Sequence, residues 1–275
     1  MVNALTIDLE DWYQGLTSTS RQIDQWPTFE NRVVENTERI LEILGLAGVK
    51  ATFFVLGYVA DRFPNLIRRV ADYGHEIALH GYHHQHVHRL TLEQFRRDVV
   101  LGMEAVQQAS GKKIIGYRAP MFSIRSSNTW ALQELCAMGF LYDSSMFPIR
   151  NFYYGNPNVP RHPYRPLEDH SFTEFPLATV RLIGNNWPIG GGFYVRTLPY
   201  QLIQAGIRRL NKEGKPAVIY FHPWELDQGQ HYNQVTFRER ITHYHGRASL
   251  QNKLCRMLND FDFAPLNQLL DGIPQ

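Results

Sequence analysis

Two histidines, His80 and His84, stand four residues apart directly after the apolar run Glu76–Leu79. One helical turn at this spacing would place both imidazoles on the same face, where they could bind a single divalent cation. The alternative is a solvated surface loop, because His83 and His86 crowd the same stretch. Acidic, arginine and histidine residues at the ends of other predicted strands favour the metal site.

An acidic cluster, Asp8, Glu10 and Asp11, closes the first apolar segment. Three carboxylates so close together repel one another, and a cation or an arginine is the usual relief. Strand alternation would put Asp8 and Glu10 on one face. A chain that curls after Leu9 would instead bring Asp8 and Asp11 together, and a solvated acidic turn is the third interpretation. The spacing leaves all three open.

Three more polar residues follow predicted strands. Arg118 comes after Tyr117 and could hold a catalytic carboxylate, although an arginine there is often a surface residue. His222 leaves the predicted strand 217–221 and suits a general acid, since a histidine pKa lies near neutrality. Asp143 could accept a hydrogen bond from the far ring nitrogen of His222. The alternative for His222 is a core histidine satisfied by a backbone carbonyl.

Apolar runs alternate with amphipathic stretches along most of the chain. The short runs predicted as strands are 5–7, 51–56, 76–79, 114–117, 140–142, 175–182 and 217–221. The stretches predicted as helices are 31–46, 66–73, 91–110, 198–210 and one from Ser126 or Ser127 to just before Gly139.

This alternation predicts an α/β fold, a parallel sheet with helical crossovers closed into a barrel of about seven or eight units. In such folds the reactive residues sit at the carboxyl ends of strands. The residues that fall there are Asp8, His80, Arg118, Asp143 and His222.

Composition narrows the class of protein. With 275 residues and 44% hydrophobic content, the chain can bury a large core as one domain, 1–275. A net charge of +2 with scattered basic residues argues against a nucleic-acid partner. The two cysteines, Cys136 and Cys255, form no CxxC pattern and suit a reducing compartment. Aromatic content of 13% is generous and mildly favours a carbohydrate ligand.

No apolar run is long enough to span a bilayer, so we expect no integral membrane segment. The chain enters its first strand without a basic leader or an apolar signal core, and this predicts a cytoplasmic location. The stretch 148–166, rich in Pro and Asn, is interpreted as a long loop on the rim of the barrel.

Taken in order, these motifs form a pattern. The acidic triplet is followed by His-x-x-x-His, then by Arg118-Ala119-Pro120, by Tyr-Asp-Ser-Ser from residue 142, and by a strand ending at His222. The chain resembles the polysaccharide deacetylases of carbohydrate esterase family four, the NodB-like superfamily, from about residue 4 to residue 270. Residues 7–13, 190–193 and 222–225 look most like the branch associated with exosortase-linked exopolysaccharide loci.

The resemblance implies a distorted, NodB-like (β/α) barrel with a C-terminal extension from about residue 230. It also implies a divalent metal held by one carboxylate and two histidines. Carried over residue by residue, it makes His80 and His84 the metal pair, Asp8 the general base, Arg118 the partner of that base, and His222 the general acid.

Two positions depart from the family pattern. The family has two adjacent aspartates in its first motif, whereas Leu9 follows Asp8 here, so the metal carboxylate must be Glu10 or Asp11. Asp11 is preferred, because a short side chain suits a chain that curls toward the site. Gly81 stands where the family usually has Ser or Thr, which removes a hydroxyl from the turn.

The expected function is hydrolysis of N-acetyl groups from amino-sugar units of an exopolysaccharide or its precursor. The cofactor would be a divalent metal, with zinc preferred and cobalt or nickel compatible with the same ligands. The expected partner is an N-acetylated oligo- or polysaccharide. The rival functions are hydrolysis of a small cyclic amide or imide, and catalytically silent sugar binding by the same fold.

Overall fold

Eight parallel strands form the centre of the computed structural model, which describes residues 1–151, 154–167 and 172–272. Their bounds are β1 (Asn3–Leu9), β2 (Thr52–Val55), β3 (Glu76–Leu79), β4 (Gly116–Tyr117), β5 (Tyr142–Asp143), β6 (Thr173–Glu174), β9 (Val218–Phe221) and β10 (Phe263–Ala264). A separate antiparallel hairpin consists of β7 (Thr179–Leu182) and β8 (Asn185–Pro188).

The sheet runs in the order β10-β1-β2-β3-β4-β5-β6, and β9 also pairs with β1. Backbone hydrogen bonds extend this curved sheet beyond its ladders: Ala178 N donates to Val218 O at 3.0 Å, and Tyr220 N donates to Gly190 O at 2.7 Å. The segments that flank the hairpin therefore lie against β9. The predicted α/β architecture, a distorted parallel barrel of seven or eight strands, is confirmed.

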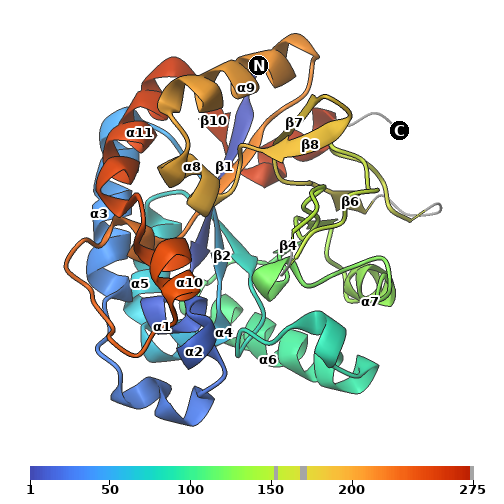
Figure 1. Ribbon diagram of the computed structural model, residues 1–275. Helices are drawn as coiled ribbons and strands as arrows, with labels where there is room; N and C mark the ends of the chain where they lie inside the picture. The colour runs from blue at the N-terminus through green and yellow to red at the C-terminus, as the bar shows by residue number, and fades with distance from the viewer. Residues whose placement is uncertain (152–153, 168–171, 273–275) are drawn as a thin grey trace.

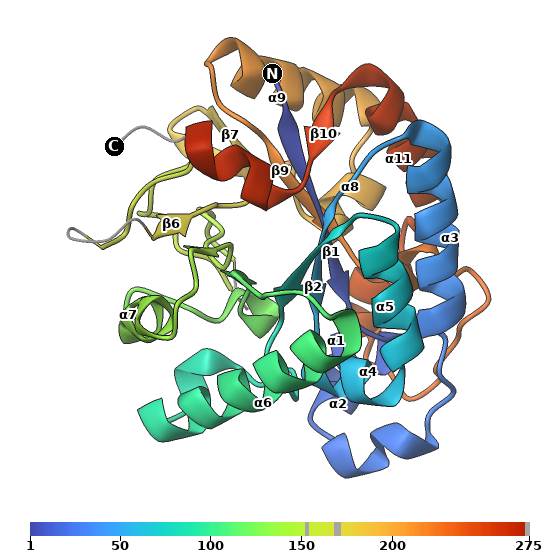
Figure 2. The ribbon, with the colours of Figure 1, turned by 180° about the vertical axis from the view of Figure 1, so that it is seen from behind.

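Helices surround the outside of the sheet in both views (Figures 1 and 2). The α-helices are α1 (Trp12–Gly15), α2 (Thr17–Ser20), α3 (Val33–Ala47), α4 (Gly57–Arg62), α5 (Pro64–Asp72), α6 (Leu92–Ser110), α7 (Trp130–Ala137), α8 (Gly192–Thr197), α9 (Tyr200–Lys212), α10 (Phe237–Glu239) and α11 (Arg247–Asp260). Short 3-10 helices cover Ile23–Thr28, Val87–Arg89, Pro120–Phe122, Pro223–Leu226 and Leu266–Gly272, and a π-helical turn covers Arg240–Tyr244.

The central strands are buried on both faces, as expected where helices cover a parallel sheet. All seven residues of β1 are buried, and so are all four of β2, β3 and β9.

Helix α6 begins with the predicted capping box, in which Thr91 and Gln94 cap each other's backbone. It ends at Gly111 in the left-handed conformation, as predicted.

The predicted strands 114–117 and 140–142 overlap β4 and β5 only in part, and two other predicted elements differ more from the structure. Helix α7 begins at Trp130, later than Ser126 or Ser127, because Asn128 Oδ1 accepts a hydrogen bond from Arg125 N and closes a turn first. The predicted strand 175–182 is interrupted, and only Thr179–Leu182 is strand. This stretch pairs with β8 across Ile183 and Gly184, both at positive φ, which is the geometry of a tight hairpin turn.

The C-terminal segment returns to the sheet. Strand β10 pairs with the start of β1 through Asn3 and Phe263. Helix α11 packs against α3, α8 and α9. Among the described residues, no helix is both long and apolar enough to cross a membrane.

Two helical glycines give a matched test of packing. A Cβ at Gly102, in α6, would lie 2.8 Å from Leu79 Cδ1 and 3.1 Å from the backbone of Gly81, whereas a Cβ at Gly45, in α3, would meet nothing within 4 Å. We expect Gly45→Ala to stabilise the protein by up to about 1 kcal/mol. Gly102→Ala should destabilise it by about 1–3 kcal/mol, because overpacking outweighs helix propensity. Chemical denaturation measures both, and an equal gain for both variants would contradict the packing described.

Candidate metal centre and proton-transfer site

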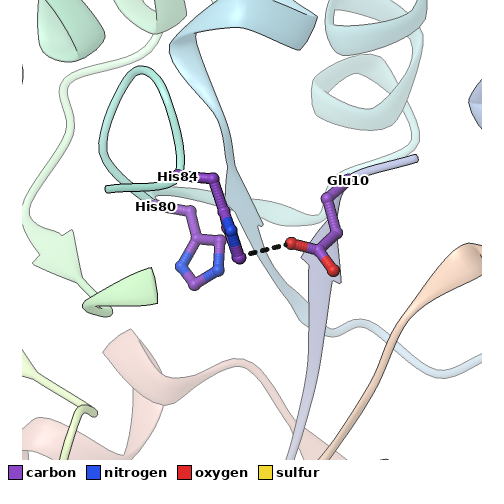
Figure 3. Close-up of side chains that lie close together, drawn as sticks. All are labelled: Glu10, His80 and His84. Carbon is purple, nitrogen blue, oxygen red and sulfur yellow. Dashed lines mark ion pairs between the residues drawn. The ribbon is translucent and has the colours of Figure 1, made fainter. Parts of the chain in front are cut away.

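Glu10, His80 and His84 converge at the carboxyl ends of β1 and β3 (Figure 3). One ligand atom from each residue lies within 4.8 Å of the other two, and all three side chains are buried. Two imidazole nitrogens and one carboxylate oxygen are a donor set typical of a catalytic zinc-type site, which leaves further positions for water and substrate.

His80 has one ring nitrogen committed. Its Nδ1 lies 2.8 Å from the backbone oxygen of Arg118, and this carbonyl can only accept, so Nδ1 carries the proton. Burial and the nearby His84 lower the pKa of His80 to about 3. The imidazole is therefore neutral, with Nε2 as a lone-pair donor, the arrangement found in metal-ligating histidines.

Glu10 and His84 approach each other without forming a hydrogen bond. Glu10 Oε2 lies 2.8 Å from His84 Nε2, yet this buried oxygen has no hydrogen-bond partner, and neither does His84 Nδ1. Although burial opposes it, the interactions with His84 and His222 lower the pKa of Glu10. An ionised, buried oxygen without a donor fits a bound divalent cation.

The loop that carries His84 is irregular, so the expectation of a helical turn between His80 and His84 was wrong. Gly81 has φ +73° and His84 has φ +54°. The chain is held in this shape by Asp98 of α6, which accepts from Tyr82 N at 3.0 Å and His83 N at 3.3 Å. A Cβ at Gly81 would lie 2.8 Å from Asp98 Oδ2, so glycine suits this position by space and by φ.

Asp11 lies outside the metal group, which corrects the preference for it over Glu10. Its carboxylate caps α1, accepting from Trp12 N at 2.8 Å, and also binds Arg32 N at 2.8 Å and Val33 N at 3.0 Å. Burial raises its pKa to about 6 in spite of these hydrogen bonds. The chain curls after Leu9, as considered, but the curl turns Asp11 toward the backbone of α1 and α3.

Asp8 and Arg118 form a buried ion pair. Arg118 Nη1 donates to Asp8 Oδ1 at 2.6 Å and to Thr6 Oγ1 at 2.8 Å, while Nη2 donates to Ser144 Oγ at 2.8 Å. The arginine is fully buried, and its guanidinium lies 4.1 Å from the centre of the Phe54 ring. This network fixes the Asp8 carboxylate at the edge of the cavity that Glu10 also lines.

His222 is oriented by Glu225, not by Asp143 as expected. Its Nδ1 lies 2.7 Å from Glu225 Oε1, and its Nε2 lies 3.5 Å from Glu10 Oε1. Burial opposes protonation, but the charges of Glu10 and Glu225 raise the pKa of His222. Glu225 in turn pairs with Arg196. The positive charges of Arg196 and His222 outweigh burial and lower the pKa of Glu225 to about 2. The spacing of three residues after His222 was the signal that could have identified Glu225.

Asp143 belongs to a different network. It accepts from Ser145 Oγ at 2.6 Å, and Ser145 Oγ also accepts from Ala119 N at 2.8 Å, next to Arg118. Asp143 forms a buried carboxyl pair with Glu174. Burial raises the pKa of both, and Asp143 raises that of Glu174 further, so Glu174 holds the proton. Asp143 therefore supports the loop behind the site.

A cavity of about 200 Å³ joins Asp8, the metal group and His222. One wall is a stack of rings: Trp224 lies 4.7 Å from His222 and 4.1 Å from His243, both nearly parallel. Trp224 Nε1 also donates to Glu10 Oε1 at 3.2 Å. His243 lines the same cavity, and its buried Nε2 has no hydrogen-bond partner. No sequence pattern indicated that Trp224 and His243 are neighbours.

Two family models match consecutive parts of the chain. Residues 19–140 match the family described as polysaccharide deacetylase, and residues 144–271 match a domain of unknown function, DUF3473. The candidate ligands His80 and His84 lie in the first segment and His222 in the second, while Asp8 and Glu10 precede both.

Curated relatives match over part of their length. The chain is 32% identical to the peptidoglycan-N-acetylglucosamine deacetylase of Bacillus cereus over 102 residues, which is 37% of this chain and 37% of that protein. It is 29% identical over 140 residues to the peptidoglycan-N-acetylmuramic acid deacetylase PdaA of Bacillus subtilis, 50% of this chain and 51% of that protein. The chain thus spans about a third to a half of these relatives.

Solved structures extend the likeness over the chain. A crystal structure from Mycobacterium smegmatis, whose provisional designation is polysaccharide deacetylase, superposes with a TM-score of 0.64 at 26% identity, covering 98% of this chain and 88% of that one. A CE4 family pseudoenzyme from Bacillus anthracis superposes with a TM-score of 0.52 at 15% identity, covering 98% and 65%. The second likeness concerns the fold alone.

The neighbouring carboxylates Glu10 and Asp11 allow a matched test of the metal centre. Glu10→Gln should weaken metal binding by more than about a hundredfold, because it removes a charged ligand. Asp11→Asn makes the same chemical change, carboxylate to amide, at the adjacent residue. This variant should retain stoichiometric metal, since an asparagine still caps a helix. The measurement is the amount of metal bound per chain after dialysis. Loss of metal from Asp11→Asn alone would make Asp11, and not Glu10, the ligand.

The Asp143–Glu174 pair predicts a pH dependence of stability. A carboxyl whose pKa is raised by folding stabilises the native state below its unfolded pKa, here 4.5 for Glu174, and that contribution is lost as pH rises toward the folded pKa. Glu174→Gln cannot lose this proton, so its free energy of unfolding should fall less than that of the wild type between about pH 5 and pH 8.

The exposed Glu93→Gln, on the surface of α6, is the control for this experiment. Urea denaturation at several pH values should show parallel curves for Glu93→Gln and the wild type. Parallel curves for Glu174→Gln as well would mean that Glu174 does not hold a proton in the native state whose loss costs stability.

Proposed function

We propose that this chain, whose residues 19–140 match the polysaccharide deacetylase family, is a metal-dependent hydrolase that removes N-acetyl groups from amino-sugar units of a polysaccharide. The observation that carries the proposal is one cavity lined by a candidate metal group, a fixed carboxylate at Asp8 and an oriented imidazole at His222. Amide hydrolysis needs a polarised carbonyl, a base for water and an acid for the leaving amine.

Each proton-transfer residue has a defined position. Asp8, held by Arg118, would accept the proton of the attacking water. His222 would protonate the leaving amine from Nε2, because Glu225 accepts from Nδ1 and so fixes the tautomer and orientation. Trp224 stacks on the imidazole and limits its movement.

Glu10, His80 and His84 would hold the metal. When bound, it would polarise the acetamide carbonyl and lower the pKa of water in the site. We favour zinc for this donor set, and cobalt or nickel would accept the same ligands. Arg118 assists here as well, since its backbone carbonyl keeps His80 in the tautomer that presents Nε2.

The proposed substrate is an N-acetylated exopolysaccharide or its precursor. The exopolysaccharide assignment rests on the resemblance of residues 7–13, 190–193 and 222–225 to the exosortase-associated branch. A polymer is favoured over a cyclic amide because a larger groove adjoins the cavity through Tyr194. Silent sugar binding is disfavoured because Asp8 and His222 are both in place, and binding alone needs neither.

The test is acetate release from N-acetylated oligosaccharides by the metal-loaded protein, with a chelator-treated sample as control. We expect release that depends on added metal and increases from the monosaccharide to the hexasaccharide. Release from a cyclic imide but not from any oligosaccharide would favour the rival enzyme. Binding of oligosaccharide with no release in the presence of zinc, cobalt or nickel would favour the silent binding protein.

His222→Ala should keep stoichiometric metal while lowering kcat by about 10²–10⁴, the usual contribution of a general acid. Asp8→Asn should behave similarly, because it keeps the shape of the side chain but loses the base. His231→Ala removes an exposed histidine that stacks on Tyr244 and serves as the control. A metal-free His222→Ala protein would make His222 a ligand, and unchanged activity would remove it from the mechanism.

A further inference from the structure

A groove with a volume of about 1180 Å³ lies beside the metal cavity. It is bordered by residues 148–150 and 157–161, by the β7–β8 hairpin and by helix α9. Figure 1 shows the hairpin at the upper right and α9 at the top. Tyr194 lines both the groove and the metal cavity, and the chain passes from one to the other between Arg150 and Asn151. The groove and the metal cavity are therefore adjacent, and the volume of the groove is about six times that of the cavity.

The groove is cationic. Its lining includes Arg150, Arg161, Arg181 and Arg209, and no aspartate or glutamate among the residues that the structure describes. Glu213 lies close enough to compensate two of these charges, at 3.2 Å from Arg209 and 3.8 Å from Arg161. Arg150 and Arg181 are exposed and make no ion pair or side-chain hydrogen bond with any described residue. Exposed guanidinium groups without an ion-pair partner can bind carboxylate or phosphate oxygens.

The same lining carries groups that recognise sugars. Trp187 of β8 is 55% exposed, although an indole ring is usually buried, and it offers a flat apolar surface for stacking. Asn158 and Asn185 supply amides that can donate to and accept from hydroxyl groups. A phosphate site alone would need neither the aromatic ring nor the volume of this groove.

We propose that this groove binds the acidic part of a polysaccharide, with Arg150 and Arg181 contacting the carboxylates of uronic-acid units while an acetylated unit occupies the metal cavity. The placement of the acetylated unit rests on the proposed deacetylase function. The affinity of the groove for acidic glycan does not, because it depends on residues outside the catalytic cavity.

The test uses a matched pair of ligands, cellohexaose and its C6-oxidised counterpart, a β-1,4-linked glucuronate hexamer. These differ only in their carboxylates, and neither carries an acetamide, so no turnover accompanies binding. Calorimetry on the metal-loaded protein should show the acidic hexamer binding at least about tenfold more tightly. The preference should weaken as salt is raised, because the arginines are exposed.

Arg150→Gln/Arg181→Gln removes two charges and keeps hydrogen-bonding side chains. It should abolish the preference for the acidic hexamer and leave cellohexaose affinity within about twofold, at an unchanged melting temperature. Arg97→Ala, an exposed arginine on α6 away from the groove, is the control and should bind as the wild type does.

Three results would overturn the proposal: equal affinity for the two hexamers, a preference that survives in Arg150→Gln/Arg181→Gln, or arginine-dependent binding of inorganic diphosphate without binding of the acidic hexamer. The last would make the groove a phosphate site. Acidic-hexamer binding without acetate release in the separate assay would leave the groove standing and reject the deacetylase function. Acetate release without any preference for the acidic hexamer would support the deacetylase function and reject the proposed role of the groove.

Discussion

The buried guanidinium of Arg118 is the interaction on which the site depends. A charge without exposure to water costs several kcal/mol unless it is fully paired, and here Asp8, Thr6 and Ser144 supply the partners. Since Arg118 follows β4, these contacts tie it to β1 and to the segment after β5. The backbone carbonyl of Arg118 accepts a hydrogen bond from His80, so this one residue orients both the candidate base, Asp8, and a candidate metal ligand, His80.

The site is assembled from both halves of the chain. The candidate ligands come from the residue after β1 and from the loop after β3, whereas His222, Glu225 and Arg196 come from the segment that matches the domain of unknown function. That second segment also supplies the hairpin and helix that border the cationic groove. The N-terminal half therefore provides the candidate metal centre, and the C-terminal half provides the imidazole and the surface beside it.

Much of this organisation could be predicted from the sequence. Alternating apolar and amphipathic runs predict a parallel sheet, because period and burial are local properties of each segment. The topology of such a sheet brings the carboxyl ends of its strands to one edge, so Asp8, His80, Arg118 and His222 were expected there. The capping box at Thr91 and the stop at Gly111 follow from equally local chemistry.

Choices between near neighbours needed the tertiary structure. Glu10 and Asp11 carry the same chemistry one residue apart, and the decision came from three backbone N–H groups, two of them more than twenty residues away, that occupy Asp11. His222 likewise turns to Glu225 because Arg196, distant in sequence, holds that carboxylate in place. By itself the sequence determined the types of groups and the edge where they meet. Only the packed structure decided which atoms face each other, because hydrogen bonds between distant segments depend on coordinates that no local pattern contains.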